Sequence, residues 1–201
     1  MRFAVFPAML ALLLSGCAAL QAPRVDSTTL YLLDAQPAAA APRPPRDLVL
    51  AVASPRARPG FATAQMAYVR EPHKLDYYAK NRWVDTLVRM LAPLLTQALA
   101  QDGAYRAVVQ APSPVAADLR LDTELVRLQQ DFALQPSRVQ LTLRAQLVEV
   151  KTSRVLATRE FDQQENAPSE NAYGGAIAAN RALARLLGEL KNFCSAGADG
   201  R

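Results

Sequence analysis

The sequence has few of the side chains on which metal binding and nucleophilic catalysis depend. Among its 201 residues are one histidine, His73, and two cysteines, Cys17 and Cys194. Zinc sites use several Cys and His ligands together, and these three residues lie too far apart in the sequence to suggest such a site. Eight glycines against fourteen prolines also argue against a glycine-rich nucleotide fold. We therefore predict a binding or assembly protein with no cofactor.

Enzyme signatures are missing as well. There is no G-x-S-x-G motif, and His73 follows Pro72 in a predicted turn with no cysteine near it. Acidic pairs such as Glu165 and Glu170 have no surrounding residues that would suggest glycosidase chemistry. The composition, 51% hydrophobic and 20% charged with a net charge of +5, is typical of one globular domain with a substantial core.

The amino terminus has the pattern of an export signal. Arg2 precedes an apolar stretch, 3–14, that is shorter than the roughly 20 residues of a membrane-spanning helix and fits a signal peptide. The following Leu14-Ser15-Gly16-Cys17 resembles the bacterial lipobox. That resemblance implies a signal peptide over 1–16 and a mature chain that begins at Cys17, with diacylglycerol on its thiol and an acylated amine. The alternative is an ordinary secretory peptide with an incidental cysteine.

The residues after Cys17 indicate where the mature protein resides. Residue 18 is alanine, so by resemblance to Gram-negative lipoproteins the usual aspartate signal for inner-membrane retention is missing. We expect a lipid-anchored protein on the periplasmic side of the outer membrane, with a tether over 17–28 and no nucleic-acid partner. Once Cys17 carries lipid, Cys194 has no disulfide partner in the chain, and we interpret it as a small core-like thiol.

Hydrophobic alternation predicts mostly β structure in the mature chain. The strand candidates cover 28–33, 48–53, 65–70, 75–79, 105–109, 119–128, 139–147 and 155–163. Glu71-Pro72-His73-Lys74 predicts a hairpin turn between two of them. A change of phase predicts a bulge near Leu125-Val126. The last three strands are expected to pair antiparallel, with Val139, Leu141, Leu143, Ala145 and Leu147 facing a core and Gln140, Thr142, Arg144 and Gln146 facing water.

Two amphipathic helices complete the predicted fold. The first covers 81–101, where an apolar stripe includes Val84 and an internal Pro93 predicts a kink, and Asp102-Gly103 ends it. The second covers 169–193, with Ser169 as its N-cap, and residues 196–201 are expected to form a disordered tail. The fold class is therefore α+β, as a two-layer sandwich of a mostly antiparallel sheet against two long helices.

Three short motifs resemble a known family. These are Arg58-Pro59-Gly60-Phe61, then Met66-x-Tyr68-x-Arg70, then Tyr77-Tyr78-Ala79-x-Asn81-Arg82-Trp83 before the first helix. Together with the order of elements, they resemble the auxiliary lipoproteins of ABC-type transport systems, the PqiC-like family. The resemblance extends over most of the mature chain, and it implies one domain over 29–195.

The resemblance implies a role beside an MCE (MlaD-like) protein and an ABC transporter or permease. Such systems move phospholipids or other hydrophobic molecules between the two membranes, and the lipoprotein would dock at the outer-membrane side, with homo-oligomers possible. The candidate partner-binding residues combine aromatic and guanidinium groups, as interfaces often do. They are Arg58, Phe61, Tyr68, Tyr77, Tyr78, Arg82 and Trp83, with Arg70 beside them. For Tyr68 and Trp83 the alternative is a place in the core.

A second function of another class stays open from the sequence. The chain could be a structural or pilot lipoprotein for assembly of a different outer-membrane or cell-envelope complex, such as a secretion channel. Only the motifs between Phe61 and Trp83 favour the transport role over this one.

Overall fold

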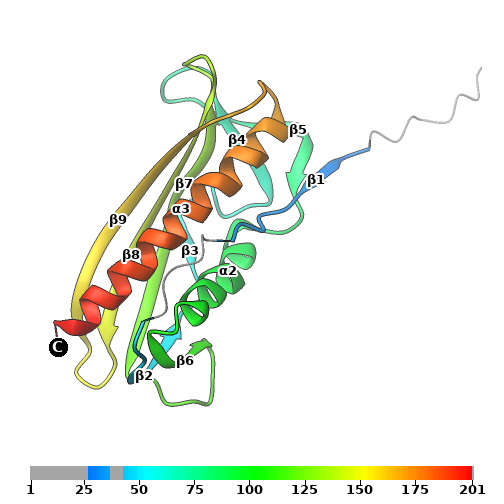
Figure 1. Ribbon diagram of the computed structural model, residues 1–201. Coiled ribbons are helices and arrows are strands. Elements are labelled where there is room, and N and C mark those ends of the chain that lie inside the picture. The colour runs from blue at the N-terminus through cyan, green and yellow to red at the C-terminus, as the bar shows by residue number, and fades with distance from the viewer. Residues whose placement is uncertain (1–26, 37–42, 201) are drawn as a thin grey trace, which may run out of the picture.

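A computed structural model describes residues 27–36 and 43–200, and within them nine strands and two helices form an α+β domain (Figure 1). The strands are β1 (Thr29–Tyr31), β2 (Arg46–Val52), β3 (Arg56–Ala57), β4 (Gln65–Val69), β5 (Leu75–Trp83), β6 (Tyr105–Gln110), β7 (Leu119–Asp131), β8 (Arg138–Glu149) and β9 (Arg154–Asn166). The helices are α2 (Leu87–Gln101) and α3 (Ala172–Asp199). The predicted α+β class is confirmed.

β7 is the central strand of the sheet. On one side it pairs antiparallel with β8, which pairs antiparallel with β9, as the sequence predicts. On the other side, β2, β3 and β4 follow one another along β7, all of them parallel to it. Since β1 with β5 and β2 with β6 are also parallel, the sheet is mixed rather than purely antiparallel, and the prediction of a mostly antiparallel sheet holds only in part. Hydrophobic alternation identifies a strand but contains no information on the direction of its neighbour.

The change of phase in β7 is a bulge, as predicted. Its register against β8 shifts between Leu125 and Arg127, which keeps Leu125 and Leu128 both buried although they are an odd number of positions, three, apart. An extra residue in one strand moves the side chains that follow it to the other face. The bulge thus preserves one continuous apolar face along a thirteen-residue strand.

β8 follows the predicted alternation on its core face and departs from it at one position. Val139, Leu141, Leu143, Ala145 and Leu147 are all buried, as expected. Thr142 was expected to face water, but its side chain is only 2% exposed. Its hydroxyl donates a 2.5 Å hydrogen bond to Asp162 and accepts one from Arg127, so neighbouring strands cover it.

The predicted start of the first helix is wrong. Residues 81–83 belong to β5, where Asn81, Arg82 and Trp83 pair in parallel with Thr29, Leu30 and Tyr31 of β1, and α2 begins only at Leu87. The apolar spacing of 81–101 fits a helix locally, but pairing with a strand far away in the sequence decides the conformation of 81–83. Val84, predicted in the buried stripe, is consequently exposed.

The interior and end of α2 agree with the sequence. Pro93 lies inside the helix, and Asp102 is the C-cap. Gly103 follows with φ +68°, the left-handed conformation that commonly ends a helix at glycine. Leu91, Leu95 and Leu99 on the predicted stripe are buried.

α3 begins later and ends later than predicted. Its N-cap is Asn171 rather than Ser169, because the Asn171 side chain accepts a hydrogen bond from the backbone N–H of Gly174. At the other end, residues 196–199 were expected in a disordered tail but continue the helix, and Ala198 is buried. Apolar contact with the sheet extends the helix beyond the leucine stripe that the sequence displays.

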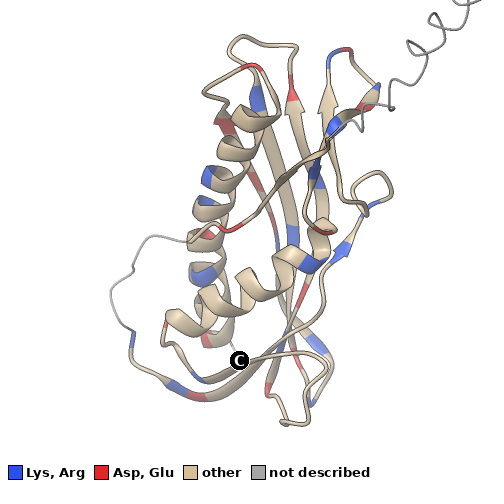
Figure 2. Cartoon of the chain, turned by 90° about the vertical axis from the view of Figure 1, so that its right-hand side faces the viewer, with Lys and Arg blue, Asp and Glu red and all other residues tan. Residues whose placement is uncertain are grey.

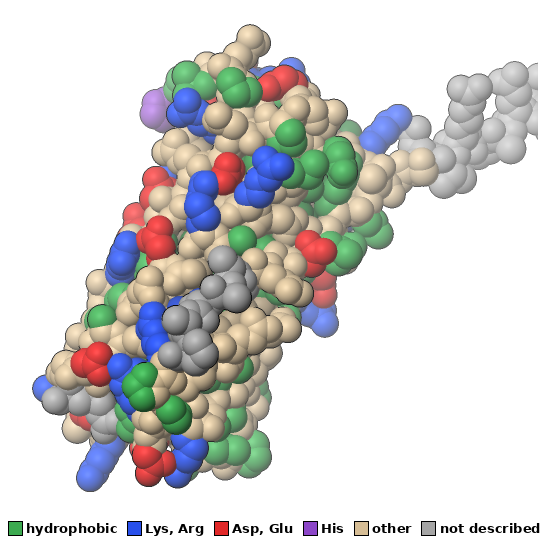
Figure 3. Space-filling model, viewed as in Figure 1, with side chains coloured by type: hydrophobic (Ala, Val, Ile, Leu, Met, Phe, Trp, Pro, Cys, Tyr) green, Lys and Arg blue, Asp and Glu red, His purple; other side chains and the backbone are tan. Residues whose placement is uncertain are grey.

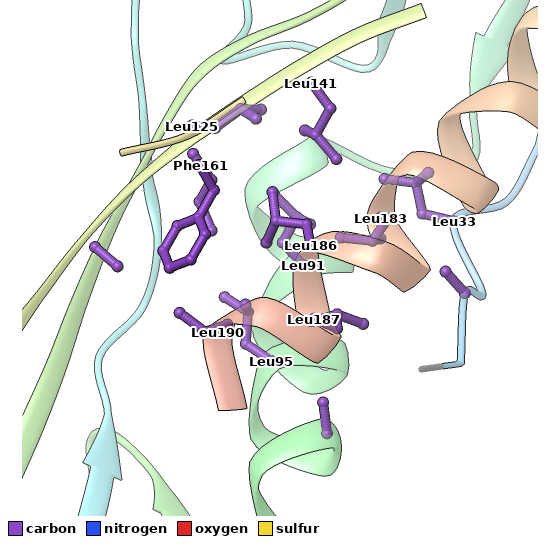
Figure 4. Close-up of a cluster of buried hydrophobic side chains, with 14 of the residues drawn as sticks. Leu33, Leu91, Leu95, Leu125, Leu141, Phe161, Leu183, Leu186, Leu187 and Leu190 are labelled. Carbon is purple, nitrogen blue, oxygen red and sulfur yellow. The ribbon is translucent and has the colours of Figure 1, made fainter. Parts of the chain in front are cut away.

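The two helices and the sheet enclose one core. Both helices lie in front of the strands in Figure 1, and the close-up in Figure 4 shows leucines of α2 and α3 converging on side chains of the sheet. The labelled members are Leu33, Leu91, Leu95, Leu125, Leu141, Phe161, Leu183, Leu186, Leu187 and Leu190, all buried. Within the described residues, neither helix combines the length and the apolar character that crossing a membrane would need.

Candidate partner-binding site

The β4–β5 hairpin positions most of the residues that the sequence nominates. Its strands pair antiparallel, with Tyr68 opposite Asp76 and Ala67 opposite Tyr77. Since side chains alternate between faces, Tyr68 shares a face with Tyr78, and Tyr77 points to the other. The hairpin therefore divides the predicted residues into two groups rather than bringing them into one site.

The first group forms a compact cluster of rings around an arginine. The ring centroids of Tyr68 and Tyr78 are 4.8 Å apart, and the ring of Phe132 meets Tyr68 edge-on at 6.0 Å. The guanidinium of Arg70 lies 5.3 Å from the Tyr68 ring centroid and 5.5 Å from that of Phe132. We call Tyr68, Arg70, Tyr78 and Phe132 the Arg70 cluster.

This cluster has the chemistry of a recognition surface. Arg70 is exposed, while Tyr68 and Phe132 are half-buried, so a charged and planar group is presented on a fixed aromatic base. Stacking on the rings orients the guanidinium and leaves N–H groups for a partner. Tyrosine and arginine in such settings are frequent energetic centres of interfaces.

Sequence reasoning did not identify Phe132. It follows the last residue of β7, and its backbone N–H donates to the carbonyl of Val69 at the end of β4. The available signal was an aromatic residue between the predicted strands 119–128 and 139–147, two positions before Leu134, which the structure shows to be exposed. The parallel pairing of β4 with β7, which brings Phe132 beside Tyr68, is not visible in the sequence.

A chain of hydrogen bonds fixes the cluster to the start of α3. The hydroxyl of Tyr78 donates to Oε1 of Gln130 at 2.9 Å, and Nε2 of Gln130 donates to the hydroxyl of Ser137 at 2.8 Å. The backbone N–H of Ser137 then donates to the carboxylate of Glu170 at 2.9 Å. Burial raises the pKa of Tyr78 to about 12, which keeps this hydroxyl a donor over the physiological range.

The second group lies on the other face of the hairpin. The hydroxyl of Tyr77 donates to the carbonyl of Gly60 at 2.9 Å, so the loop with Phe61 is fastened to β5. Gly60 has φ +90°, a conformation that favours glycine, and Phe61 is partly buried against the core. Arg58 is exposed, with Glu124 4.0 Å from its Nε.

The two remaining candidate residues, Arg82 and Trp83, are adjacent in the sequence, but one is exposed and the other is buried. Trp83 is only 4% exposed and belongs to the hydrophobic core, so the core alternative that the sequence left open for it is correct. Arg82 is exposed and paired with Leu30 of β1. Tyr68, for which the same alternative was open, is half-buried and contributes its ring to the Arg70 cluster.

The structure describes one of the two cysteines. Cys17, the predicted lipid attachment residue, lies outside the described residues. Cys194 is fully buried in α3, and burial raises the pKa of its thiol to about 12, as for an unreactive structural cysteine.

Acidic and basic residues are interleaved along the strands of the sheet (Figure 2), and on the polar face of β7, β8 and β9 they pair with one another. Arg120 makes two hydrogen bonds from Nε and one from Nη2 to the Asp122 carboxylate, and Arg144 makes ion pairs with Glu124 and Glu160. Pairing of this kind cancels most of the local charge. We interpret this face as a solvated surface.

The mixed sheet of nine strands and its two helices define an α+β domain among the described residues. A family model of the ABC-type transport auxiliary lipoprotein component matches residues 31–190, and the chain belongs to this family. No functionally curated protein matches the chain by sequence.

Solved structures share the fold. Protein XCC0632 from Xanthomonas campestris is similar with a TM-score of 0.77 and 22% identity, over 85% of this chain and 98% of that one. The hypothetical protein CT253 from Chlamydia trachomatis has a TM-score of 0.51 and 8% identity, over 75% and 99% of the two chains. At these identities the likeness establishes the fold alone.

Proposed function

We propose that this chain is an outer-membrane lipoprotein facing the periplasm, which serves an ABC- and MCE-type phospholipid transport system by docking to its partner proteins. The observation that carries the proposal is the family match over residues 31–190. The lipobox-like segment that ends at Cys17 supports the anchor, and the Arg70 cluster supplies a surface suited to protein recognition.

The geometry of the Arg70 cluster supports a docking role. The pocket beside Tyr78 and Trp83 has a volume of about 10 Å³, so it has room for one water molecule and not for an acyl chain. The Arg70 cluster, by contrast, is held in place by ring contacts and by the hydrogen bond of Tyr78 to Gln130. A fixed surface loses little conformational freedom on binding.

The anchor is tested with Cys17→Ser in the full-length precursor. We expect this variant to leave the outer-membrane fraction, while the circular dichroism of the purified protein stays that of the wild type. Continued fractionation of the unlipidated variant with outer membranes would contradict the anchor.

The docking role is tested by affinity capture of the full lipidated chain from cell envelopes after cross-linking, with mass spectrometry of the captured proteins. The expected partners are an MCE protein and the permease or ATPase of an ABC transporter. Arg70→Ala with Phe132→Ala should reduce their recovery at least tenfold with an unchanged melting temperature. Arg56→Ala, at an exposed arginine of β3, is the matched control. Recovery of secretion-channel proteins in place of these partners would overturn the transport role.

A further inference from the structure

Exposed hydrophobic side chains gather around β1, the first strand of the domain. Leu30 is 58% exposed and Leu32 is 56% exposed, and Val84 beside them is exposed too. The backbone N–H of Val84 donates to the carbonyl of Tyr31, which places Val84 next to this strand. Figure 3 shows hydrophobic side chains close to the N-terminal end of the described residues. We call Leu30, Leu32 and Val84 the β1 patch.

The pairing of β1 with β5 explains why these side chains are not in the core. Tyr31 is opposite Trp83, whose side chain is buried, so both point toward the helices. Leu30 is opposite Arg82, and because side chains alternate, this pair points the other way. Leu32 continues the outward side, and no described element covers it. Tyr173 at the start of α3 is also exposed, with its ring 6.5 Å from that of Tyr31.

We propose that the β1 patch rests on the lipid bilayer and orients the domain at the membrane surface. This inference depends on the proposed lipid anchor at Cys17. Twelve residues lie between Cys17 and Leu30, so the thirteen steps of chain from one to the other can span at most about 45 Å. The patch is thus the part of the domain that is tied most closely to the membrane along the chain, whereas the turn between β8 and β9 lies at the other end of the molecule (Figure 1).

The chemistry of the patch fits lipid better than an anionic partner. Transfer of leucine and valine side chains from water to the acyl-chain boundary lowers the free energy, and tyrosine side chains such as Tyr173 are favoured at that boundary. The charges nearby are of both signs: Arg82 and Asp34 are oppositely charged, and Asp85 makes an ion pair with Arg89 at 3.2 Å. Contact driven by apolar burial should therefore be insensitive to salt and to the fraction of anionic lipid.

The test uses the full lipidated chain in phosphatidylethanolamine–phosphatidylglycerol vesicles, with Leu32→Cys carrying an environment-sensitive fluorophore. Cys194 is buried and Cys17 is blocked by lipid, so the label attaches at one position. With quencher lipids in the vesicles, we expect the label at position 32 to lose more than half of its emission, at low and at high salt. A label at Val155→Cys on β9, where the valine is similarly exposed, should lose almost none.

A charged variant tests whether the tether alone, without contact by the β1 patch, could bring position 32 close enough to the membrane for quenching. Leu30→Asp with Val84→Asp leaves the tether unchanged, and we expect it to abolish quenching at position 32. Leu134→Asp with Val115→Asp, at exposed apolar residues elsewhere, should leave the quenching intact. Equal quenching in the two double variants, or none at position 32 in a protein that floats with the vesicles, would overturn the proposal. A protein that does not float would instead contradict the anchor itself.

Discussion

Gly175 of α3 lies so close to Gln130 of β7 that a Cβ atom added to this glycine would be 2.3 Å from Oε1 of Gln130. That oxygen accepts the hydrogen bond of Tyr78, so the contact joins α3 to the Arg70 cluster through one amide. Gly174 and Gly175 are both buried, and the lack of a side chain at each allows close packing at the start of the helix.

Gly175→Ala should therefore destabilise the fold. Overpacking of a close contact typically costs about 1–3 kcal/mol, and relief by moving Gln130 would break its hydrogen bond with Tyr78. Urea unfolding followed by circular dichroism measures the change. Gly188→Ala in the same helix is the control, because nothing lies within 4 Å of a Cβ there, and it should stabilise by about 0.5–1 kcal/mol. Similar effects of the two substitutions would contradict the packing role of Gly175.

Local sequence patterns predict part of the fold and part of the candidate site. The bulge after Leu125 and the core face of β8 were predictable because alternation is a local signal. The strand conformation of Trp83 and the placement of Phe132 beside Tyr68 were not, because each depends on pairing with a segment far away in the chain. The predicted site was divided for the same reason, since hairpin register decides which tyrosine faces which side.

Leu143 provides a direct test of the core face. It lies in the middle of β8 and is almost fully buried, so Leu143→Ala should remove about 2–5 kcal/mol from the free energy of unfolding. Gln164→Ala, at an exposed position of the neighbouring strand, should change it by no more than about 0.5 kcal/mol. If both variants lowered the denaturant concentration at the unfolding midpoint by similar amounts, the assignment of this face of β8 to the core would be contradicted.

Tyr78 should make the fold sensitive to alkaline pH. Burial raises its pKa from 10.0 to about 12, so the unfolded chain loses this proton at lower pH than the folded one. The contribution to stability is complete below pH 10 and is lost as the pH rises from about 10 to about 12. Because Tyr78 is half-buried, solvent screening limits it to about 1 kcal/mol. In unfolding titrations from pH 8 to 12, Tyr78→Phe should flatten this part of the profile, and Tyr173→Phe, at an exposed ring, should not.

Cys194 should be inert in the native protein. Its side chain has no exposed surface, and its raised pKa keeps the thiolate scarce at neutral pH. In Cys17→Ser, where Cys194 is the sole thiol, a thiol-reactive dye should label the protein only as it unfolds in urea. Rapid labelling of the folded protein would show that the end of α3 opens readily.

Substitutions at the adjacent residues Arg82 and Trp83 distinguish an effect on docking from an effect on folding. Trp83→Ala removes a buried ring from the core between β5 and the helices and should destabilise by about 3–5 kcal/mol. Arg82→Ala removes an exposed side chain, so the melting temperature should hardly change, whereas recovery of partner proteins should fall if the guanidinium contributes to docking. Thermal melts paired with affinity capture measure both quantities on the same preparations. A stable Trp83→Ala variant with normal folding would contradict the place of this ring in the core, and unchanged capture by Arg82→Ala would restrict docking to the Arg70 cluster.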